Sequence, residues 1–198
     1  MTVLQARVIS TPPGPKTGLR SFLKQQTAAR HQQIDDSFDQ FKLDTQQGYS
    51  GFLTAHCIAW SALADDWSEA VAHLLGTAAP DYAQMLVQDL AELGQPAAAG
   101  LPGVAVESPA CDAGMAYVLA GSRMGIGTIN RKPHWGSSIG HDSRFLTDGQ
   151  GADLFRGVIA YLDGPQGQAL DRELALQSAH QSFDVFGKAV EIAKRTMQ

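Results

Sequence analysis

The chain of 198 residues contains only two cysteines, Cys57 and Cys111, which limits the metal and disulfide chemistry available to it. Both fall in segments whose spacing is typical of amphipathic helices. This argues against a disulfide framework and against a thiolate metal site. We therefore expect two reduced, buried thiols.

The sequence also lacks a strong charge of either sign and any long hydrophobic run. Its formal net charge of −5 provides no general attraction for nucleic acid or for an anionic membrane surface. No run approaches the roughly 18 apolar residues that a membrane helix needs. Residues 1–10 lack both the basic start and the apolar core of a secretory signal. We expect a cytoplasmic protein that binds neither nucleic acid nor membranes.

Proline is concentrated near the N-terminus. Residues 1–18 include three prolines between positions 11 and 15, and prolines cannot donate backbone hydrogen bonds. We expect residues 1–18 to form a flexible tail. The remaining residues, 19–198, are enough for one domain with a single core.

Apolar residues in that domain recur every three or four positions, which is the spacing of helices, and no convincing strand alternation is present. Asp81 is a candidate N-cap, Gly76 is a candidate helix end, and Ser108-Pro109 suits the start of a helix. The predicted helices cover residues 19–41, 49–74, 82–93, 108–133, 154–162 and 170–193, with loops at 97–107 and 134–151. The sequence therefore predicts an all-α fold.

Six histidines raise the question of a metal site. His31 alone lies on a strongly apolar helical stripe close to small and aromatic residues, where a neutral imidazole could ligate iron. The alternative is a core histidine satisfied by a hydrogen bond. His56 lies on a predicted helix and faces the core. His134 and His141 flank a loop that we expect to be solvated, although a surface metal site with Asp142 is conceivable.

A glycine-rich helix is the second informative feature. The predicted helix at 108–133 contains four glycines, each of which costs about 1 kcal/mol relative to alanine in a helix interior. Gly121 and Gly125 lie four residues apart and so share one face, where a flat ligand or a second backbone could approach closely. Tight packing against another helix would explain the same pattern.

Three segments form an ordered set across residues 19–195. The first is LKQQTAARH at 23–31, followed by Asp35, and it fits a pattern Leu-Lys-x-x-Thr-x-x-x-His with an acidic residue four positions later. The second is YVLAGSRMG at 117–125, similar to Tyr-Val-x-x-Gly-Ser-x-Leu-Gly-Gly, and the third is AHQSFDVF at 179–186. Together they resemble the opening, distal and final helices of the haem oxygenases, particularly the bacterial, biliverdin-forming branch.

The resemblance implies an all-α, single-domain helical bundle in which haem lies between the first helix and the glycine-rich distal helix. His31 would be the proximal iron ligand. Gly121 and Gly125 would let the distal backbone approach the iron. Ser122, with ordered water, would deliver protons.

The resemblance also implies contacts to the rest of the haem. Lys24 and Arg156 occupy positions of basic residues that reach the haem propionates, which are carboxylates. Thr27 and Tyr117 belong to the two matching segments and would contact the cofactor. Ordinary solvated charges would equally explain Lys24 and Arg156, and packing would explain Tyr117.

The reaction implied by the resemblance is the oxidative cleavage of haem, which would be both substrate and cofactor. With O2 and with electrons from an external reductase or a ferredoxin, the products would be biliverdin, carbon monoxide and ferrous iron. The reaction would serve to release iron or to supply biliverdin to a bilin-binding photoreceptor.

Ile126 departs from the family pattern, because the bacterial sequences carry a second glycine there. Its β-branched side chain would either narrow the distal pocket or point into the helical core. A narrowed pocket favours a haem carrier or sensor over an enzyme. A third hypothesis is a helical domain without haem, in which the glycines serve packing.

Overall fold

The computed structural model describes residues 18–95 and 103–197, and within these ranges the chain forms helices and no strand. The helices are α1 (Leu19–Phe38), α2 (Gln46–Ala62), α3 (Ala64–Leu75), α4 (Tyr82–Glu92), α5 (Asp112–Asn130), α6 (Trp135–Ser138), α7 (Arg144–Thr147), α8 (Gly151–Asp163), α9 (Pro165–Ala169) and α10 (Arg172–Thr196). The predicted all-α fold is confirmed. The predicted tail lies outside the described residues except for Gly18, which precedes α1.

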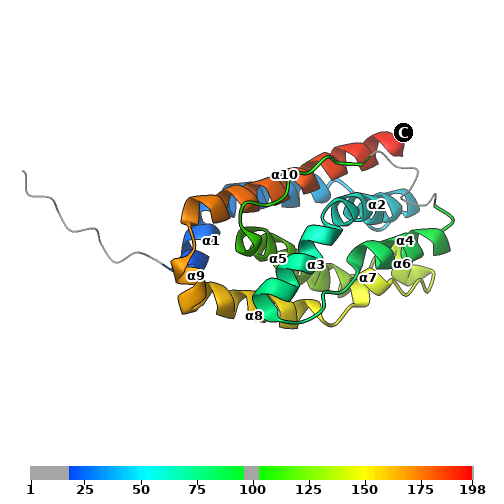
Figure 1. The fold of residues 1–198 in the computed structure, drawn as a ribbon. Coiled ribbons are helices and arrows are strands. Elements are labelled where there is room, and N and C mark those ends of the chain that lie inside the picture. The colour runs from blue at the N-terminus through cyan, green and yellow to red at the C-terminus, as the bar shows by residue number, and fades with distance from the viewer. Residues whose placement is uncertain (1–17, 96–102, 198) are drawn as a thin grey trace, which may run out of the picture.

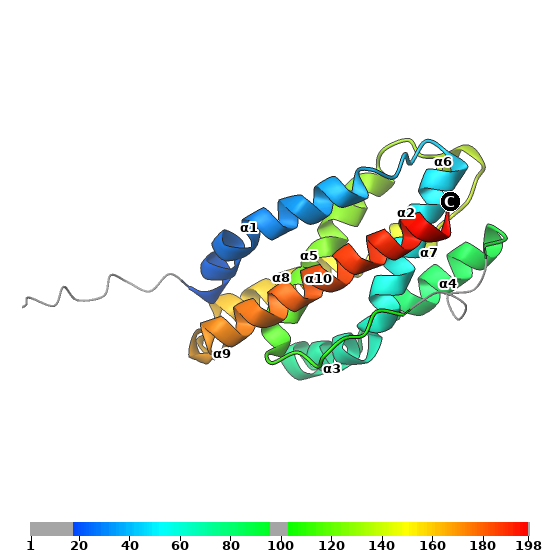
Figure 2. The same cartoon turned by 90° about the horizontal axis from the view of Figure 1, so that it is seen from above.

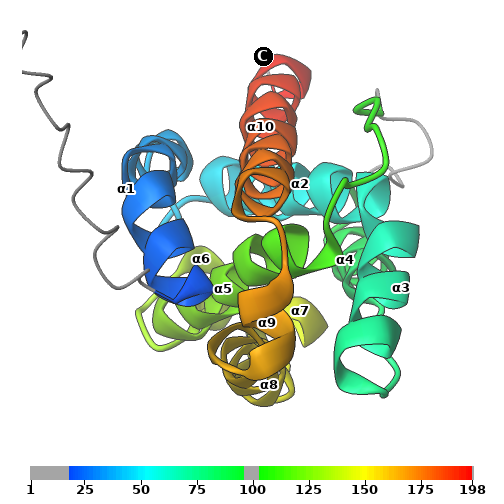
Figure 3. The ribbon, with the colours of Figure 1, turned by 60° about the vertical axis from the view of Figure 1, so that its left-hand side comes forward.

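α5 runs through the middle of the molecule (Figure 1). α10 packs along one side of α5 and α8 along the opposite side (Figure 3). α1 runs beside α10 (Figure 2), and it packs mainly against α10 and also against α8. The arrangement therefore leaves space between α1 and α5.

The core is centred on α10, against which α2 and α5 both pack closely. Gly114 permits the contact between α5 and α10, because a Cβ at this position would collide with the backbone of Ala175. Tight helix packing therefore explains Gly114. None of the helices in the described ranges is long and apolar enough to cross a membrane.

Two of the predicted helix ends are confirmed. The side chain of Asp81 accepts a hydrogen bond from the Gln84 amide, which satisfies one of the free amides at the start of α4. Gly76 ends α3 with φ of 65°, a left-handed conformation that favours glycine.

The single helix predicted over 49–74 is wrong, because the chain turns at Leu63 and forms α2 and α3. Leu63 has φ of −112° and ψ of 7°, outside the helical region, and its side chain is buried. The apolar spacing continues through this turn, since residues on both sides of it contact the same core. Periodicity alone could not reveal the break.

The predicted helix start at Ser108-Pro109 is also wrong. Cys111 is the N-cap of α5, with an extended backbone, and its amide donates a hydrogen bond to Ser178 Oγ at 2.9 Å. This contact with α10 fixes where α5 begins. Cys111 is therefore half-buried at a helix end, whereas Cys57 is buried as predicted, and both thiols are free.

Candidate functional site

A cavity of about 560 Å³ lies between α1 and α5 and is closed behind by α2 and α10. This volume is within the roughly 300–1,000 Å³ that is common for cofactor pockets. Five phenylalanines contribute to its wall: Phe38, Phe52, Phe155, Phe183 and Phe186. The space is thus largely apolar and aromatic.

His31 lies on the α1 side of this cavity. The predicted stripe on α1 begins with the buried residues Leu23 and Thr27, and it leaves the core at His31, whose side chain is 59% exposed. The alternative of a buried core histidine is therefore wrong. The ring of His31 packs edge-on against Phe183, with 6.1 Å between ring centroids.

Asp35 fixes the orientation of the His31 ring. One of its carboxylate oxygens lies 2.9 Å from His31 Nδ1, one helical turn away. Partial burial raises the pKa of Asp35, and the imidazole of His31 opposes that effect. With Nδ1 donating to a carboxylate, Nε2 is the nitrogen left to bind a metal, as in many metal-ligating histidines.

The opposite wall is the glycine face of α5. A Cβ at Gly125 would meet nothing within 4 Å, and one at Gly121 would meet only the Phe155 ring, at 3.8 Å. These two glycines therefore do not serve helix packing, in contrast to Gly114. They keep side-chain atoms out of the cavity.

Ser122 and Ile126 contribute to the same wall. The hydroxyl of Ser122 donates to the Leu119 carbonyl at 2.8 Å, which leaves only its lone pairs for the cavity. Ile126 is 3% exposed and belongs to the hydrophobic core as well as to the cavity wall. Its side chain thus packs largely against the protein.

Tyr117 lies in the cavity wall and Thr27 lies behind it, buried. Burial raises the pKa of Tyr117, although hydrogen bonding with the Thr27 side chain and the charge of Arg20 both oppose this. Arg20 forms an ion pair with Asp163 at 3.1 Å, which joins α1 to α8. Tyr117 is thus the polar group of the cavity wall at this end, and Arg20 lies near it, paired with Asp163, outside the wall.

Lys24 and Arg156 do not lie in the cavity wall. Lys24 is exposed on α1, and Arg156 is exposed on α8, where it forms an ion pair with Asp153 of its own helix. The residue before it, Phe155, is the one that reaches the cavity. The roles predicted for Lys24 and Arg156 remain predictions.

The sequence placed His56 in the core but gave no indication that it faces the same cavity as His31. Its Nδ1 lies 3.0 Å from the Phe52 carbonyl, so Nδ1 carries the hydrogen and Nε2 keeps a lone pair. Burial is the main reason that its pKa is lowered to about 3, and His56 is therefore neutral at physiological pH. Its position depends on how α2 packs behind α1, which one helix's periodicity does not reveal.

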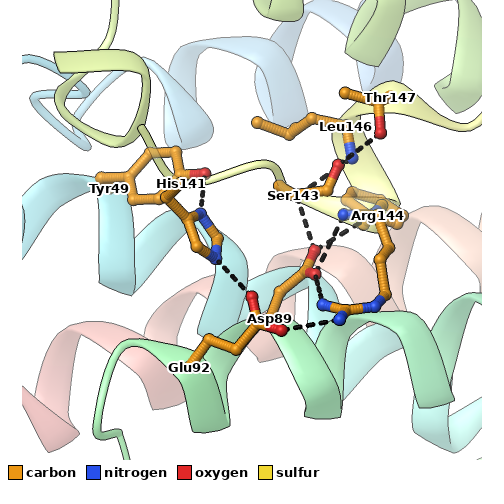
Figure 4. A network of polar contacts seen from close by, with 9 residues as sticks. Tyr49, Asp89, Glu92, His141, Ser143, Arg144, Leu146 and Thr147 are labelled. Carbon is orange, nitrogen blue, oxygen red and sulfur yellow. Dashed lines mark hydrogen bonds and ion pairs between the residues drawn. The ribbon is translucent and has the colours of Figure 1, made fainter. Parts of the chain in front are cut away.

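The expectation that His134 and His141 lie in a solvated loop is wrong. Both imidazoles pack around Tyr49 of α2. His134 stacks on the Tyr49 ring with 5.2 Å between ring centroids. His141 Nδ1 lies 3.0 Å from the Tyr49 hydroxyl (Figure 4). His134 also caps the short helix α6. Within the described ranges, no group of three or more histidine, cysteine or acidic side chains could hold a metal ion.

No protein-family model and no curated protein matches the sequence. Among solved structures, the fold is similar to the NO- and CO-bound haem oxygenase from Neisseria meningitidis, with a TM-score of 0.71 and 18% sequence identity. The match covers 91% of this chain and 92% of that chain.

This chain has the haem oxygenase fold. The predicted single-domain, haem oxygenase-like bundle is confirmed at the level of fold, whereas 18% identity does not assign a branch of the family.

The residues of the cavity fit a haem. The wall offers Nε2 of His31 for iron, a flat glycine face opposite it, and aromatic side chains around the space. A Cβ at Gly125 would project into this cradle. The donor set and the shape therefore agree with a flat, iron-containing ligand.

Proposed function

We propose that this protein binds haem between α1 and α5 through His31 and cleaves it oxidatively to biliverdin, carbon monoxide and ferrous iron. The observation that carries the proposal is the pairing of His31 with Asp35 on one cavity wall, opposite the open glycine face of α5. Bound haem would supply the redox-active iron and the ring that is cleaved.

His31 would hold the iron through Nε2, while Asp35 keeps Nδ1 protonated and strengthens the imidazole as a ligand. Phe183 limits the rotation of the ring from the side. Asp35 is therefore a positioning residue that acts through His31.

Ser122 and His56 would orient water in the cavity. The hydroxyl proton of Ser122 is committed to Leu119, and Nε2 of His56 carries a lone pair, so both groups offer acceptors rather than donors. Water molecules that donate to Ser122 Oγ and His56 Nε2 would then supply protons to oxygen. The surrounding phenylalanines would exclude bulk solvent from this water.

The polar end of the cavity would hold the propionates. Tyr117 can donate a hydrogen bond there, and Arg20 and Lys24 provide positive charge on α1. Thr27 supports Tyr117 from behind. Arg156 would assist from α8 once its ion pair with Asp153 opens.

The electrons for the reaction would come from an external reductase or a ferredoxin. The reaction would serve to release iron, or its biliverdin product would supply a bilin-binding photoreceptor. We propose this electron source and these uses from the chemistry of the reaction.

Titration with haemin followed by turnover tests the proposal. We expect a Soret band on adding haemin that is lost or shifted in His31→Ala. Adding reductant and O2 should then replace it with biliverdin absorbance. Absence of a Soret band in the wild type would refute haem binding.

The same experiment separates the enzyme from a haem carrier or sensor. A stable oxygen complex that never yields bilin would support the carrier. Turnover that appears in Ile126→Gly but not in the wild type would identify the side chain of Ile126 as the reason that the wild type does not cleave haem. Because Ile126 packs mostly into the core, we expect the wild type to turn over.

A further inference from the structure

Three oxidisable aromatic side chains form a buried cluster behind the haem cavity. Trp60 of α2 lies at the centre, with ring centroids 4.7 Å from Tyr82 of α4 and 5.5 Å from Trp67 of α3. Each of the three is at most 2% exposed. The rings are therefore in contact and almost fully buried.

One side of the aromatic cluster, at Trp60, adjoins the cavity. The Trp60 ring lies 6.4 Å from Phe186, at an interplanar angle of 88°, and Phe186 is part of the cavity wall. A single phenyl ring therefore separates Trp60 from the proposed haem site. Electron tunnelling over such a gap is fast compared with enzyme turnover.

Another side of the cluster adjoins a hollow at the surface. Trp60, Trp67 and Tyr82 all contribute to a hollow of about 210 Å³ between α3 and the start of α4. Asp65 and Asp81 complete this hollow, so its rim is acidic. It suits a small aromatic molecule that is neutral or positively charged better than an anion.

Tyr82 has a built-in proton acceptor. Its hydroxyl donates to Asp148 Oδ2 at 2.8 Å, and Arg123 lies 3.7 Å from the same carboxylate oxygen. Loss of an electron from a phenol makes its proton strongly acidic, and Asp148 is placed to take that proton. Tyr82 can therefore become a neutral radical without moving.

Packing alone does not account for the choice of side chains. The indole N–H groups of Trp60 and Trp67 have no hydrogen-bond partner, although a buried indole usually finds one. Phenylalanine, which is smaller than the indole, would bury no N–H group. What tryptophan and tyrosine add is the capacity to give up one electron.

We propose that Trp60 and Tyr82 relay single electrons from a small aromatic donor, bound in the hollow between α3 and α4, to the haem cavity. The inference rests on the proposed haem binding and adds to it a second activity, the reduction of a peroxide. The donor class is a neutral phenol or aromatic amine, and the oxidant is hydrogen peroxide.

The electrons and protons balance as follows. Trp60 gives an electron to the cavity, Tyr82 refills Trp60, and the phenol proton of Tyr82 passes to Asp148. When the donor returns one electron to Tyr82, Asp148 returns the phenol proton, and the donor releases its own proton to solvent and leaves as a neutral radical. Two such passes, with two protons taken up from water in the cavity, reduce one hydrogen peroxide to two waters and oxidise two donor molecules by one electron each.

The test uses the protein loaded with ferric haem and mixed with hydrogen peroxide. Freeze-quench electron paramagnetic resonance, with ring-deuterated tyrosine, should show a tyrosyl radical that Tyr82→Phe removes. Trp60→Phe should lower its yield severalfold, and Asp148→Asn should impair its formation. Tyr161→Phe and Trp135→Phe are the matched controls and should leave the signal unchanged.

A second readout is the oxidation of o-phenylenediamine, which should fall severalfold in Tyr82→Phe, while oxidation of the anion ascorbate should be slow in both proteins. Circular dichroism and the Soret band confirm that each variant is folded and loaded. No Soret band would refute the proposed function. A normal Soret band with no radical, or with a radical that survives Tyr82→Phe, would refute the relay alone.

Discussion

At the scale of single residues, the pairing of His31 with Asp35 sets how the imidazole would present itself to the iron of the proposed haem. A histidine on a solvent-facing helix position is ordinarily mobile. Here the carboxylate fixes the tautomer and Phe183 limits rotation, so the ring is held before any ligand arrives.

We therefore expect Asp35→Asn to weaken haemin binding by about 10–100-fold, the range typical of losing such a supporting carboxylate. Soret titration measures the dissociation constant. Asp36→Asn is the matched control, because Asp36 is also exposed on α1 but bonds to Gln32. Equal losses of haemin affinity in the two variants would show that the charge of α1, and not the contact with His31, causes the effect.

His56 should make the protein sensitive to acid. Its pKa is about 3 in the folded state and near 6.5 when unfolded, so the unfolded chain binds more protons between these values. The free energy of unfolding should fall by about 1.4 kcal/mol per pH unit as pH drops through this window.

In the absence of haem, His56→Phe should flatten that slope in urea melts between pH 6 and pH 4. Thr54→Val, a change at another buried position of α2 that removes no titratable group, should leave the slope unchanged. An unchanged slope in His56→Phe would mean that other groups dominate the acid transition.

At the scale of helices, the glycines of α5 divide into two kinds. Gly114 allows close contact with α10, whereas Gly121 and Gly125 face open space. Substitution by alanine should separate these roles.

Gly125→Ala should keep or raise stability by up to about 1 kcal/mol, because alanine favours the helix, while it lowers haemin affinity. Gly114→Ala should destabilise the apoprotein, because its Cβ meets the backbone of Ala175. Thermal melts and Soret titrations of both variants measure the two effects. Loss of stability in Gly125→Ala would contradict the open face.

The connection between α5 and α8 shows how tertiary contacts make short helices. Asp89 of α4 is fully buried and accepts hydrogen bonds from Ser143 Oγ at 2.5 Å and from the amides of Arg144 and Phe145 (Figure 4). These bonds hold α7 in place. The sequence around α7 does not contain Asp89, so taken alone it gives no indication that a short helix forms there.

At the scale of the whole molecule, the helices around the cavity differ in how firmly they are held. α2 buries 13 of its 17 residues, whereas α1 buries three of 20. α1 should therefore open more readily than the core.

We expect amide hydrogen exchange to be fast in α1 and slow in α2 of the apoprotein, with marked protection of α1 once haemin bridges α1 and α5. Haemin at 100 times its dissociation constant should add about 2.7 kcal/mol of stability. His31→Ala should lose most of the protection in α1. Protection confined to α10 would place the ligand elsewhere.

The sequence by itself determined the helical class, the caps at Asp81 and Gly76, and the common face of Gly121 and Gly125 on one helix. These depend on local spacing, on backbone conformation and on motifs within one helix. Only the tertiary structure decided the turn at Leu63, the start of α5 beyond Cys111, and the burial of His134 and His141. Each depends on a contact with a distant helix.

The same distinction holds within the cavity. The periodicity of α1 carries His31, but His56 reaches the cavity only because α2 packs behind α1 and α5. Ile126 could have narrowed the space or packed away from it, and its neighbours in the core decided that it is mostly buried. One helix fixes which residues share a face, and the packing of several helices fixes what that face meets.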